Sequence, residues 1–176
     1  LAAVGRGDLS TGRIFEGHVN AIDLIDRFGS PAQAAAARRD AGTGHVFAVW
    51  NTDIPGRPLT IRETGSGTVL EGGKSFASGV DAVTRALVTA TDAGGARHLV
   101  LLPLDPPDEA IDRSWWRPMG MRGSGSHVID FAGRALGAGQ RIGQPGDYLR
   151  QPWFGAGAIR FAAVQVGGMH GVLDAA

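Results

Sequence analysis

The chain has 176 residues, 43% of them hydrophobic, which is enough for one substantial core. Its 17 Lys and Arg balance 17 Asp and Glu, so charge gives no reason to expect a nucleic-acid or membrane-surface partner, and no apolar run approaches the ~20 residues of a membrane span. Cysteine is absent, which excludes disulfides, thiolate metal sites and a cysteine nucleophile and suits a cytoplasmic location.

Two helices are predicted at the start of the chain. Over residues 10–28 apolar side chains recur at spacings of three and four, and Ser10 is expected to cap the first turn. Gly29 and Pro31 end this helix, with Gly29 at a position that tolerates a left-handed backbone. Residues 31–39 are predicted to form a second, alanine-rich helix with Pro31 in its first turn.

The middle of the chain consists of short extended runs separated by clusters of Gly, Pro, Asp and Ser. Many short strands joined by close turns favour an antiparallel barrel or sandwich over alternating β-α-β units. The predicted fold class is therefore α+β, with an antiparallel β-barrel or sandwich flanked by α-helices. The predicted strands are residues 45–50, 59–63, 68–71, 74–78, 83–91, 98–102 and 127–131.

Helical spacing returns over residues 153–176, where Phe154, Phe161 and Met169 belong to one apolar face. Small residues are interspersed along this helix, and they let a neighbouring backbone approach closely. We expect the apolar face to pack on a partner subunit or on sequence outside this chain. Because the chain begins at Leu1 and ends inside a helical pattern, it is interpreted as a fragment of a longer polypeptide.

The Gly-Lys-Ser at residues 73–75 has a superficial similarity to a phosphate-binding loop. Position 68, where such a loop requires its first glycine, is Thr, and the residues 69–71 that follow favour an extended chain. A phosphate-binding loop must instead turn directly into a helix. The stretch is therefore interpreted as part of a β-hairpin.

Other catalytic or metal motifs are incomplete. Residues 123–127 (GSGSH) do not follow the G-x-S-x-G order of a hydrolase and are interpreted as a turn before a strand. The acidic residues between 105 and 112 lack the order of a calcium loop and are interpreted as a solvated loop. No metal-binding spacing is found among the five histidines, His18, His45, His98, His127 and His170.

Two extended segments, residues 47–51 and 74–78, each combine an aromatic residue with hydrogen-bonding side chains. This mixture suits a flat, mostly apolar ligand with a polar edge, since the aromatic stacks on the ligand face and the polar groups bind its heteroatoms. The isoalloxazine ring of a flavin is a ligand of this kind.

Several stretches in their order along the chain resemble the acyl-CoA dehydrogenase flavoproteins. Three stretches are similar to parts of the middle β domain of that family: FAVWNT at 47–52, VLEGGKSFASGVDAVTRALVTA at 69–90 and WWRPMGMRGSGSHVIDF at 115–131. Residues 12–29 resemble the end of the N-terminal helical domain, and residues 152–176 the first helix of the C-terminal domain. The resemblance implies an N-terminal part at 1–40, a middle β-barrel domain at 41–150 and a C-terminal part at 151–176.

The resemblance implies an FAD-dependent oxidoreductase that dehydrogenates an acyl-CoA thioester with hydride transfer to flavin N5. It also implies an electron-transfer protein as a partner, a homo-oligomer (dimer or tetramer) and a catalytic glutamate outside this chain. Strand backbone amides would meet the pyrimidine edge of the flavin, Phe76 would pack on the ring, and Ser78 would donate a hydrogen bond near N5. The implied cofactor-binding residues are Phe47, Ala48, Val49, Trp50, Asn51, Phe76, Ala77 and Ser78.

The sequence departs from the family pattern at positions that matter for substrate. Trp50 and Asn51 stand where the family has Thr-Glu, and IPGRP at 54–58 stands near the place of the family's G-A-G-S-D. That motif helps hold the acyl-CoA substrate, so its absence favours a second hypothesis, a flavin-dependent monooxygenase or another divergent member that binds no CoA ester. A third hypothesis, from another class, is a non-catalytic β-barrel binding or assembly module.

Overall fold

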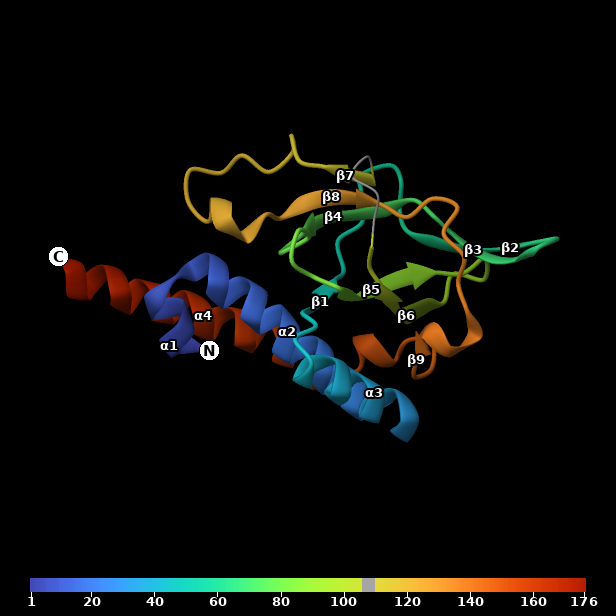
Figure 1. The fold of residues 1–176 in the computed structure, drawn as a ribbon, viewed down its shortest axis with the longest axis horizontal. Coiled ribbons are helices and arrows are strands. Elements are labelled where there is room, and N and C mark those ends of the chain that lie inside the picture. Colours follow the sequence, from blue (N-terminus) through green and yellow to red (C-terminus); the bar gives the residue numbers. More distant parts are fainter. Residues whose placement is uncertain (106–109) are drawn as a thin grey trace.

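Helices gather on one side of a β region in the computed structural model, which describes residues 1–105 and 110–176 (Figure 1). Three helices precede the strands and a long one follows them, so both chain ends lie in the helical part (Figure 1). No helix among these described residues combines the length and apolar character needed to cross a membrane. The helices are α1 (Ala2–Gly7), α2 (Leu9–Phe28), α3 (Pro31–Gly42) and α4 (Trp153–Ala175).

The helices predicted at both ends of the chain are confirmed, but two details of α2 are corrected. Asp8, not Ser10, caps α2, because its Oδ1 accepts a hydrogen bond of 2.6 Å from the backbone N–H of Thr11. Gly29 has an extended conformation (φ −73°, ψ 161°) instead of a left-handed one. The reason is that Ser30 directly caps α3, so the chain must be extended between the two helices.

The strands form two sheets, which confirms the α+β class without a closed barrel. The larger, six-stranded sheet has the order β3-β2-β5-β6-β9, with β1 also paired to β5, and the smaller has the order β4-β8-β7. The bounds are β1 (Phe47–Trp50), β2 (Thr60–Thr64), β3 (Gly67–Glu71), β4 (Gly73–Ala77), β5 (Arg85–Thr91), β6 (Arg97–Pro103), β7 (Ile111–Asp112), β8 (His127–Asp130) and β9 (Arg141–Ile142).

The pairing of these strands differs from a simple antiparallel arrangement. β1 runs parallel to β5, so the larger sheet is mixed. Residues 73–75 are extended, as predicted, but β4 pairs with β8 rather than forming a hairpin with β3. Of the acidic loop expected between residues 105 and 112, residues 106–109 lie outside the described part of the chain.

Strand β1 lies between two hydrophobic cores. The core between the sheets includes Trp50, Leu70 and Ile129, all nearly inaccessible to solvent. The second core joins α2 and α3 to the larger sheet and includes Phe47 and Leu24. Because Phe47 and Trp50 point into different cores, β1 is fixed from both sides, and it lies beside α2 (Figure 1).

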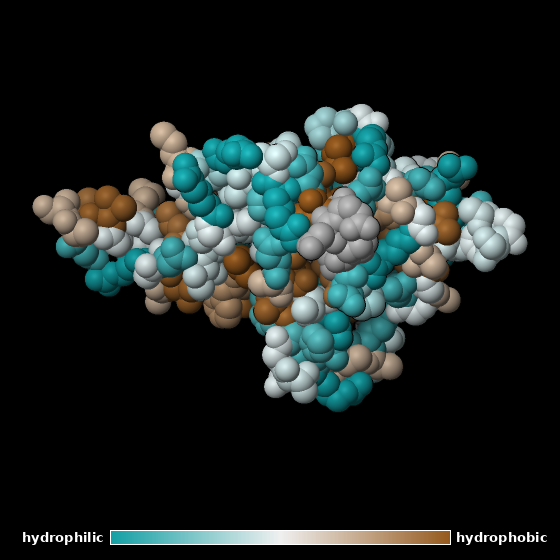
Figure 2. All heavy atoms as spheres, turned by 45° about the horizontal axis from the view of Figure 1, so that its top comes forward, coloured by the Kyte–Doolittle hydropathy of each residue, from teal (hydrophilic) through white to brown (hydrophobic). Residues whose placement is uncertain are grey.

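Close approach of backbones joins α4 to α1. A Cβ on Gly167 would lie 2.0 Å from the carbonyl oxygen of Ala2, and one on Gly5 would lie 2.2 Å from that of Val164. The face of α4 that packs on α1 therefore consists mainly of small residues, with the fully buried Val164 beside them. Large apolar side chains near the end of α4 point outward, including Met169, which is 63% exposed, and Figure 2 shows hydrophobic surface at this end of the molecule.

We expect Gly5→Ala to destabilise the protein, because its methyl group has no space against the α4 backbone. Overpacking of this kind costs about 1–3 kcal/mol. Gly7→Ala is the matched control in the same helix, since nothing lies within 4 Å of its added Cβ. Alanine also favours a helix over glycine by up to about 1 kcal/mol. Thermal melts should therefore separate the two variants, and equal melting temperatures would contradict the close packing.

Candidate functional site

A cavity of about 330 Å³ lies where β1 and β4 meet α2 and α4. Its volume falls within the range of ~300–1,000 Å³ found for small-molecule sites. A fifth part of the chain, the 3-10 helix η4 (Asp147–Leu149), also contributes to it. The lining residues are Arg13, Glu16, Asn20, Val49, Asn51, Thr52, Phe76, Tyr148, Phe154, Gly157, Ala158 and Phe161.

A larger cavity of about 640 Å³ lies between α1 and the end of α4, but fewer polar side chains line it. Its two charged lining residues are already engaged. Arg6 pairs with Asp174 at 2.6 Å, and Asp8 caps α2. The cavity between the β wall and the helices is therefore the better candidate for a functional site.

The structure divides the eight predicted flavin-binding residues into two groups. Val49, Asn51 and Phe76 line the candidate cavity. Alternation along a strand places Val49 and Asn51 on one side, so the neighbouring side chains point elsewhere. Contact of any of these residues with a flavin stays a prediction. The side chains buried outside the cavity are those of Phe47, Ala48, Trp50, Ala77 and Ser78.

Hydrogen bonds join the two predicted segments into one wall. Trp50 donates from Nε1 to the carbonyl oxygen of Ser78 at 3.1 Å, in a buried position. In addition, the backbone N–H of Ser75 in β4 donates to the carbonyl oxygen of Thr52, just after β1, at 2.9 Å. The segments around residues 50 and 78 are therefore adjacent, although they belong to different sheets.

Ser78 belongs to a buried row of serine hydroxyls. Its Oγ lies 2.9 Å from Oγ of Ser126, which lies 2.9 Å from Oγ of Ser124. Since Ser124 donates to the carbonyl oxygen of Met121, the row is filled when Ser78 donates to Ser126. A hydroxyl has one hydrogen, so donation to a flavin would require Ser78 to turn away from this row.

We expect Ser78→Ala to weaken flavin retention or to slow flavin reduction. The loss of one hydrogen bond of this kind costs about 0.5–1.5 kcal/mol. Ser126→Ala is the comparison variant, because it removes the partner of Ser78 in the row and leaves the Ser78 hydroxyl itself in place. If flavin affinity and reduction rate are unchanged in Ser78→Ala, the serine has only a structural role in the row.

Phe76 adopts an unusual backbone conformation at the cavity. Its φ of 54° is left-handed, and a β-bulge interrupts the pairing of β4 with β8 between Lys74 and Ala77. The side chain is 49% exposed and packs edge-on against Trp115, with ring centroids 4.5 Å apart. Strained backbone of this type is uncommon for bulky residues and clusters at functional sites. The bulge presents an aromatic ring to the cavity that a regular strand would turn away.

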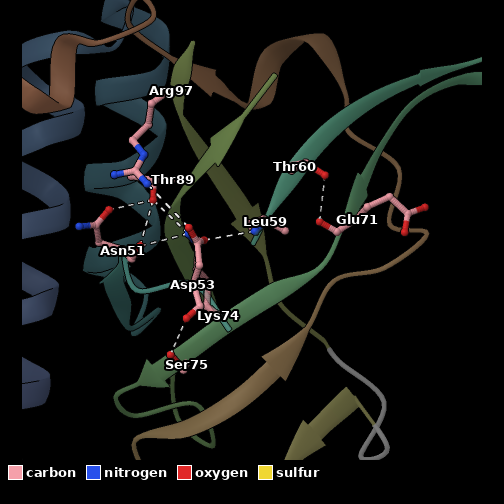
Figure 3. Close-up of polar contacts among 9 residues, drawn as sticks. All are labelled: Asn51, Asp53, Leu59, Thr60, Glu71, Lys74, Ser75, Thr89 and Arg97. Atoms are coloured by element: carbon pink, nitrogen blue, oxygen red, sulfur yellow. Dashed lines mark hydrogen bonds and ion pairs between the residues drawn. The ribbon is translucent and has the colours of Figure 1, made fainter. Parts of the chain in front are cut away.

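Lys74 is the only lysine of the chain, and its side chain is fully buried. Figure 3 shows its polar contacts. Its ammonium group donates to Oδ1 of Asp53 at 2.5 Å, to Oγ1 of Thr89 at 3.1 Å and to the carbonyl oxygen of Asn51 at 3.2 Å. Burial lowers the pKa of Lys74 below its ordinary value, and the hydrogen bond and the charge of Asp53 offset this only in part. Three acceptors thus match the three donors of the ammonium group.

This network orients the side chain of Asn51. Thr89 accepts from Lys74, and its own hydroxyl donates to Oδ1 of Asn51 at 2.9 Å (Figure 3). The amide oxygen of Asn51 is thereby held toward Thr89. Its amide nitrogen has no partner among the described residues, so it is available as a donor in the cavity that Asn51 lines.

The opposite wall carries a residue that the sequence analysis missed, Glu16 of α2. Only 3% of Glu16 is exposed, and its Oε2 accepts a hydrogen bond from Nη1 of Arg13. Burial raises the pKa of Glu16 above its ordinary value of 4.5, although the charges of Arg13 and Arg160 lower it. The available signal was the spacing of Arg13, Glu16 and Asn20, which places three polar residues on one face of the helix.

Tyr148 completes the polar part of the cavity. Burial raises the pKa of its phenol, and the charge of Glu16 raises it further. Its ring packs edge-on against Phe154 with centroids 5.4 Å apart. No hydrogen bond is found for its hydroxyl within the described ranges. The cavity therefore brings an amide, a carboxyl and a phenol together with aromatic rings.

In the part of the chain that the structure describes, no three His, Asp or Glu side chains come together as metal ligands. Two histidines have structural partners instead. Nδ1 of His18 accepts from the backbone N–H of Phe47 at 3.1 Å, and Nε2 of His98 lies 2.8 Å from Asp92.

Comparison with protein-family models and with curated proteins finds no match. Solved structures do match over nearly the whole chain. TdsC from Paenibacillus sp. A11-2, in a complex with FMN and indole, has a TM-score of 0.82 and 23% identity over 98% of this chain and 47% of its own. KijD3 in complex with dTDP has a TM-score of 0.80 and 22% identity over 99% of this chain and 47% of its own.

A third solved structure, methanesulfinate monooxygenase MsuC from Pseudomonas fluorescens, has a TM-score of 0.74 and 17% identity over 98% of this chain and 48% of its own. This chain therefore shares the fold of these proteins and spans about half of their length. This shared fold agrees with the fold that the sequence resemblance implies.

Proposed function

We propose that the chain is the flavin-binding part of a flavin-dependent oxidoreductase. The observation that carries this proposal is the cavity between a β wall formed by β1 and β4 and a helical wall formed by α2 and α4. TdsC, which shares this fold, is described in complex with FMN. We further propose that residues 1–40, 41–150 and 151–176 belong to an N-terminal helical domain, a middle β domain and a C-terminal helical domain.

The residues of the β wall fit a flat ring with a polar edge. Phe76 supplies an aromatic face, and the amide nitrogen of Asn51 supplies a donor held in place by Thr89. β1 pairs only with β5 among the described strands, so no second strand covers its other edge, although the N–H of Phe47 already donates to His18. We propose that Val49, Asn51, Thr52 and Phe76 hold the flavin, which supplies the redox chemistry when bound.

Monooxygenation is the reaction that we favour. The sequence lacks the G-A-G-S-D that helps hold an acyl-CoA, and residues 54–57 instead close a turn in which the N–H of Arg57 donates to the carbonyl oxygen of Ile54. MsuC and TdsC, which share the fold, are both described as monooxygenases. The role of this chain would be to orient the ring, to exclude water and to hold the substrate against the β wall.

Acyl-CoA dehydrogenation is the second candidate, because residues 69–90 and 115–131 resemble the middle domain of that family. Either reaction would use FMN or FAD, a homo-oligomeric assembly and a protein partner that transfers electrons. The substrate would be an acyl-CoA in the second case and a smaller organic molecule in the first.

Flavin content and two assays on the purified full-length protein test the proposal. We expect a yellow protein whose flavin, released by heat, is identified as FMN or FAD by chromatography. Substrate-dependent oxygen consumption with NADH and a separate flavin reductase would support monooxygenation, and acyl-CoA-dependent dye reduction would support dehydrogenation. A protein that stays colourless and binds neither flavin would favour a non-catalytic module.

A further inference from the structure

The buried carboxyl of Glu16 is only half engaged. Its Oε2 accepts from Arg13, whereas Oε1 has no hydrogen-bond partner among the described residues. Oε1 is not sealed in the protein, since the only fully buried side-chain polar atom without a partner in residues 1–105 and 110–176 is Nδ1 of His127. Because Glu16 lines the candidate cavity, Oε1 is accessible from that cavity.

The surroundings of this oxygen select the chemistry of its ligand. On the helical side, opposite the proposed flavin wall, the apolar part of the cavity includes the aromatic rings of Phe154 and Phe161. Arg13 already pairs with Glu16, and Arg160 pairs with Asp23 at 2.7 Å, so neither carboxylate is left without a cationic partner for a substrate cation to replace. A neutral aromatic molecule that carries one N–H or O–H group fits this arrangement, because the rings contact its faces and Oε1 accepts its hydrogen.

We propose that Glu16 is the proton acceptor of the cavity, binding the N–H or O–H of a neutral aromatic substrate and taking its proton during the reaction. In that step the substrate bond to hydrogen breaks, its electron pair stays on the substrate, and the carboxylate becomes a carboxylic acid. Arg13 positions the carboxyl through Oε2, which leaves Oε1 as the reacting atom. This inference rests on the proposed function, because the substrate lies beside the flavin wall.

Several groups set the ionisation of Glu16. Burial favours the acid, whereas Arg13 on its own helix and Arg160 on α4, which itself pairs with Asp23, favour the carboxylate. The phenol of Tyr148 senses the charge of Glu16 as well. Since the pKa of Glu16 is raised above 4.5, the carboxylate forms as the pH rises through that higher value. The hydrogen bond that Glu16 accepts from a substrate should therefore become stronger over the same pH range.

Binding of indole and of 1-methylindole to the full-length protein, measured by calorimetry, tests this inference. The two probes share a flat aromatic body, but only indole has an N–H donor. We expect the wild-type protein to prefer indole by about tenfold or more, as for a hydrogen bond to a charged group. In Glu16→Gln the preference should fall to a few-fold, because a neutral acceptor replaces the carboxylate. Asp26→Asn should leave it unchanged, since Asp26 on the same helix pairs with Arg38 at 2.9 Å.

The wild-type protein also provides a test without substitution. Its preference for indole should grow as the pH is raised above the ordinary glutamate value of 4.5, and this growth should be absent in Glu16→Gln. Equal preferences in both proteins, a preference independent of pH, or no binding of either probe would overturn the inference. Flavin content distinguishes failure of this inference from failure of the proposed function. If the protein retains flavin but its preference for indole does not depend on Glu16, only the role of Glu16 is refuted. If the protein holds no flavin, the proposed function is refuted.

Discussion

Lys74→Met should lower the free energy of unfolding by about 3 kcal/mol, as expected when one partner of a buried ion pair is removed. The ammonium group of Lys74 has three acceptors, and methionine satisfies none of them. Asp53 keeps partial access to solvent (its side chain is 26% exposed) and lies 3.7 Å from Arg97, which limits the loss. Urea denaturation measures the change.

Arg38→Met is the matched control for this loss. Arg38 pairs with Asp26, but its side chain is 64% exposed, and such surface pairs contribute at most about 1 kcal/mol. The double variant Lys74→Met, Asp53→Leu should recover part of the stability, because no charge is left without its partner. Equal losses in Lys74→Met and Arg38→Met would contradict the buried network. An intact network also predicts that amine-reactive reagents modify Lys74 only after unfolding.

Trp50→Ala should cost about 3–5 kcal/mol, which is the usual penalty for removing a large aromatic residue from a core. The indole of Trp50 is 1% exposed, and its Nε1 bond to Ser78 joins the segments that carry β1 and β4. We therefore expect loss of flavin retention together with loss of stability, both followed by thermal melts and flavin absorbance.

Trp115→Ala is the comparison for this second variant, because Trp115 is 39% exposed. It contacts the ring of Phe76 without joining the two segments. A small change in melting temperature is expected for Trp115→Ala. If the two tryptophan variants lose the same stability, Trp50 does not hold the wall together.

The sequence predicted the elements well where their periodicity is local. Residues 10–28 have helical spacing throughout, and α2 covers Leu9–Phe28. Adjacent candidates for a cap are harder to separate, because Asp8 and Ser10 both have side chains that can cap a helix. The two-residue strands β7 and β9 are too short to produce a pattern.

Long-range pairing and burial could not be read from the sequence. The parallel pairing of β1 with β5 joins residues that lie almost 40 positions apart, and no local pattern encodes it. The sequence of α2 alone does not show that Glu16 is buried. Its surroundings depend on the packing of α4, whose Gly167 and Gly168 lie against residues more than 150 positions earlier in the chain. The same limit applies to Lys74, whose position in a strand gave no sign of its acceptors.

Binding of FMN to the wild-type protein and three variants, followed by flavin fluorescence, tests most directly whether the β wall holds a flavin. Phe76→Ala and Asn51→Ala should each weaken binding several-fold, since each removes one cavity contact. Phe15→Ala should bind as the wild type does, because Phe15 is an exposed aromatic on α2 outside this cavity. Equal affinity in all four proteins, or no binding of FMN or FAD by the wild type, would contradict a flavin site at β1 and β4.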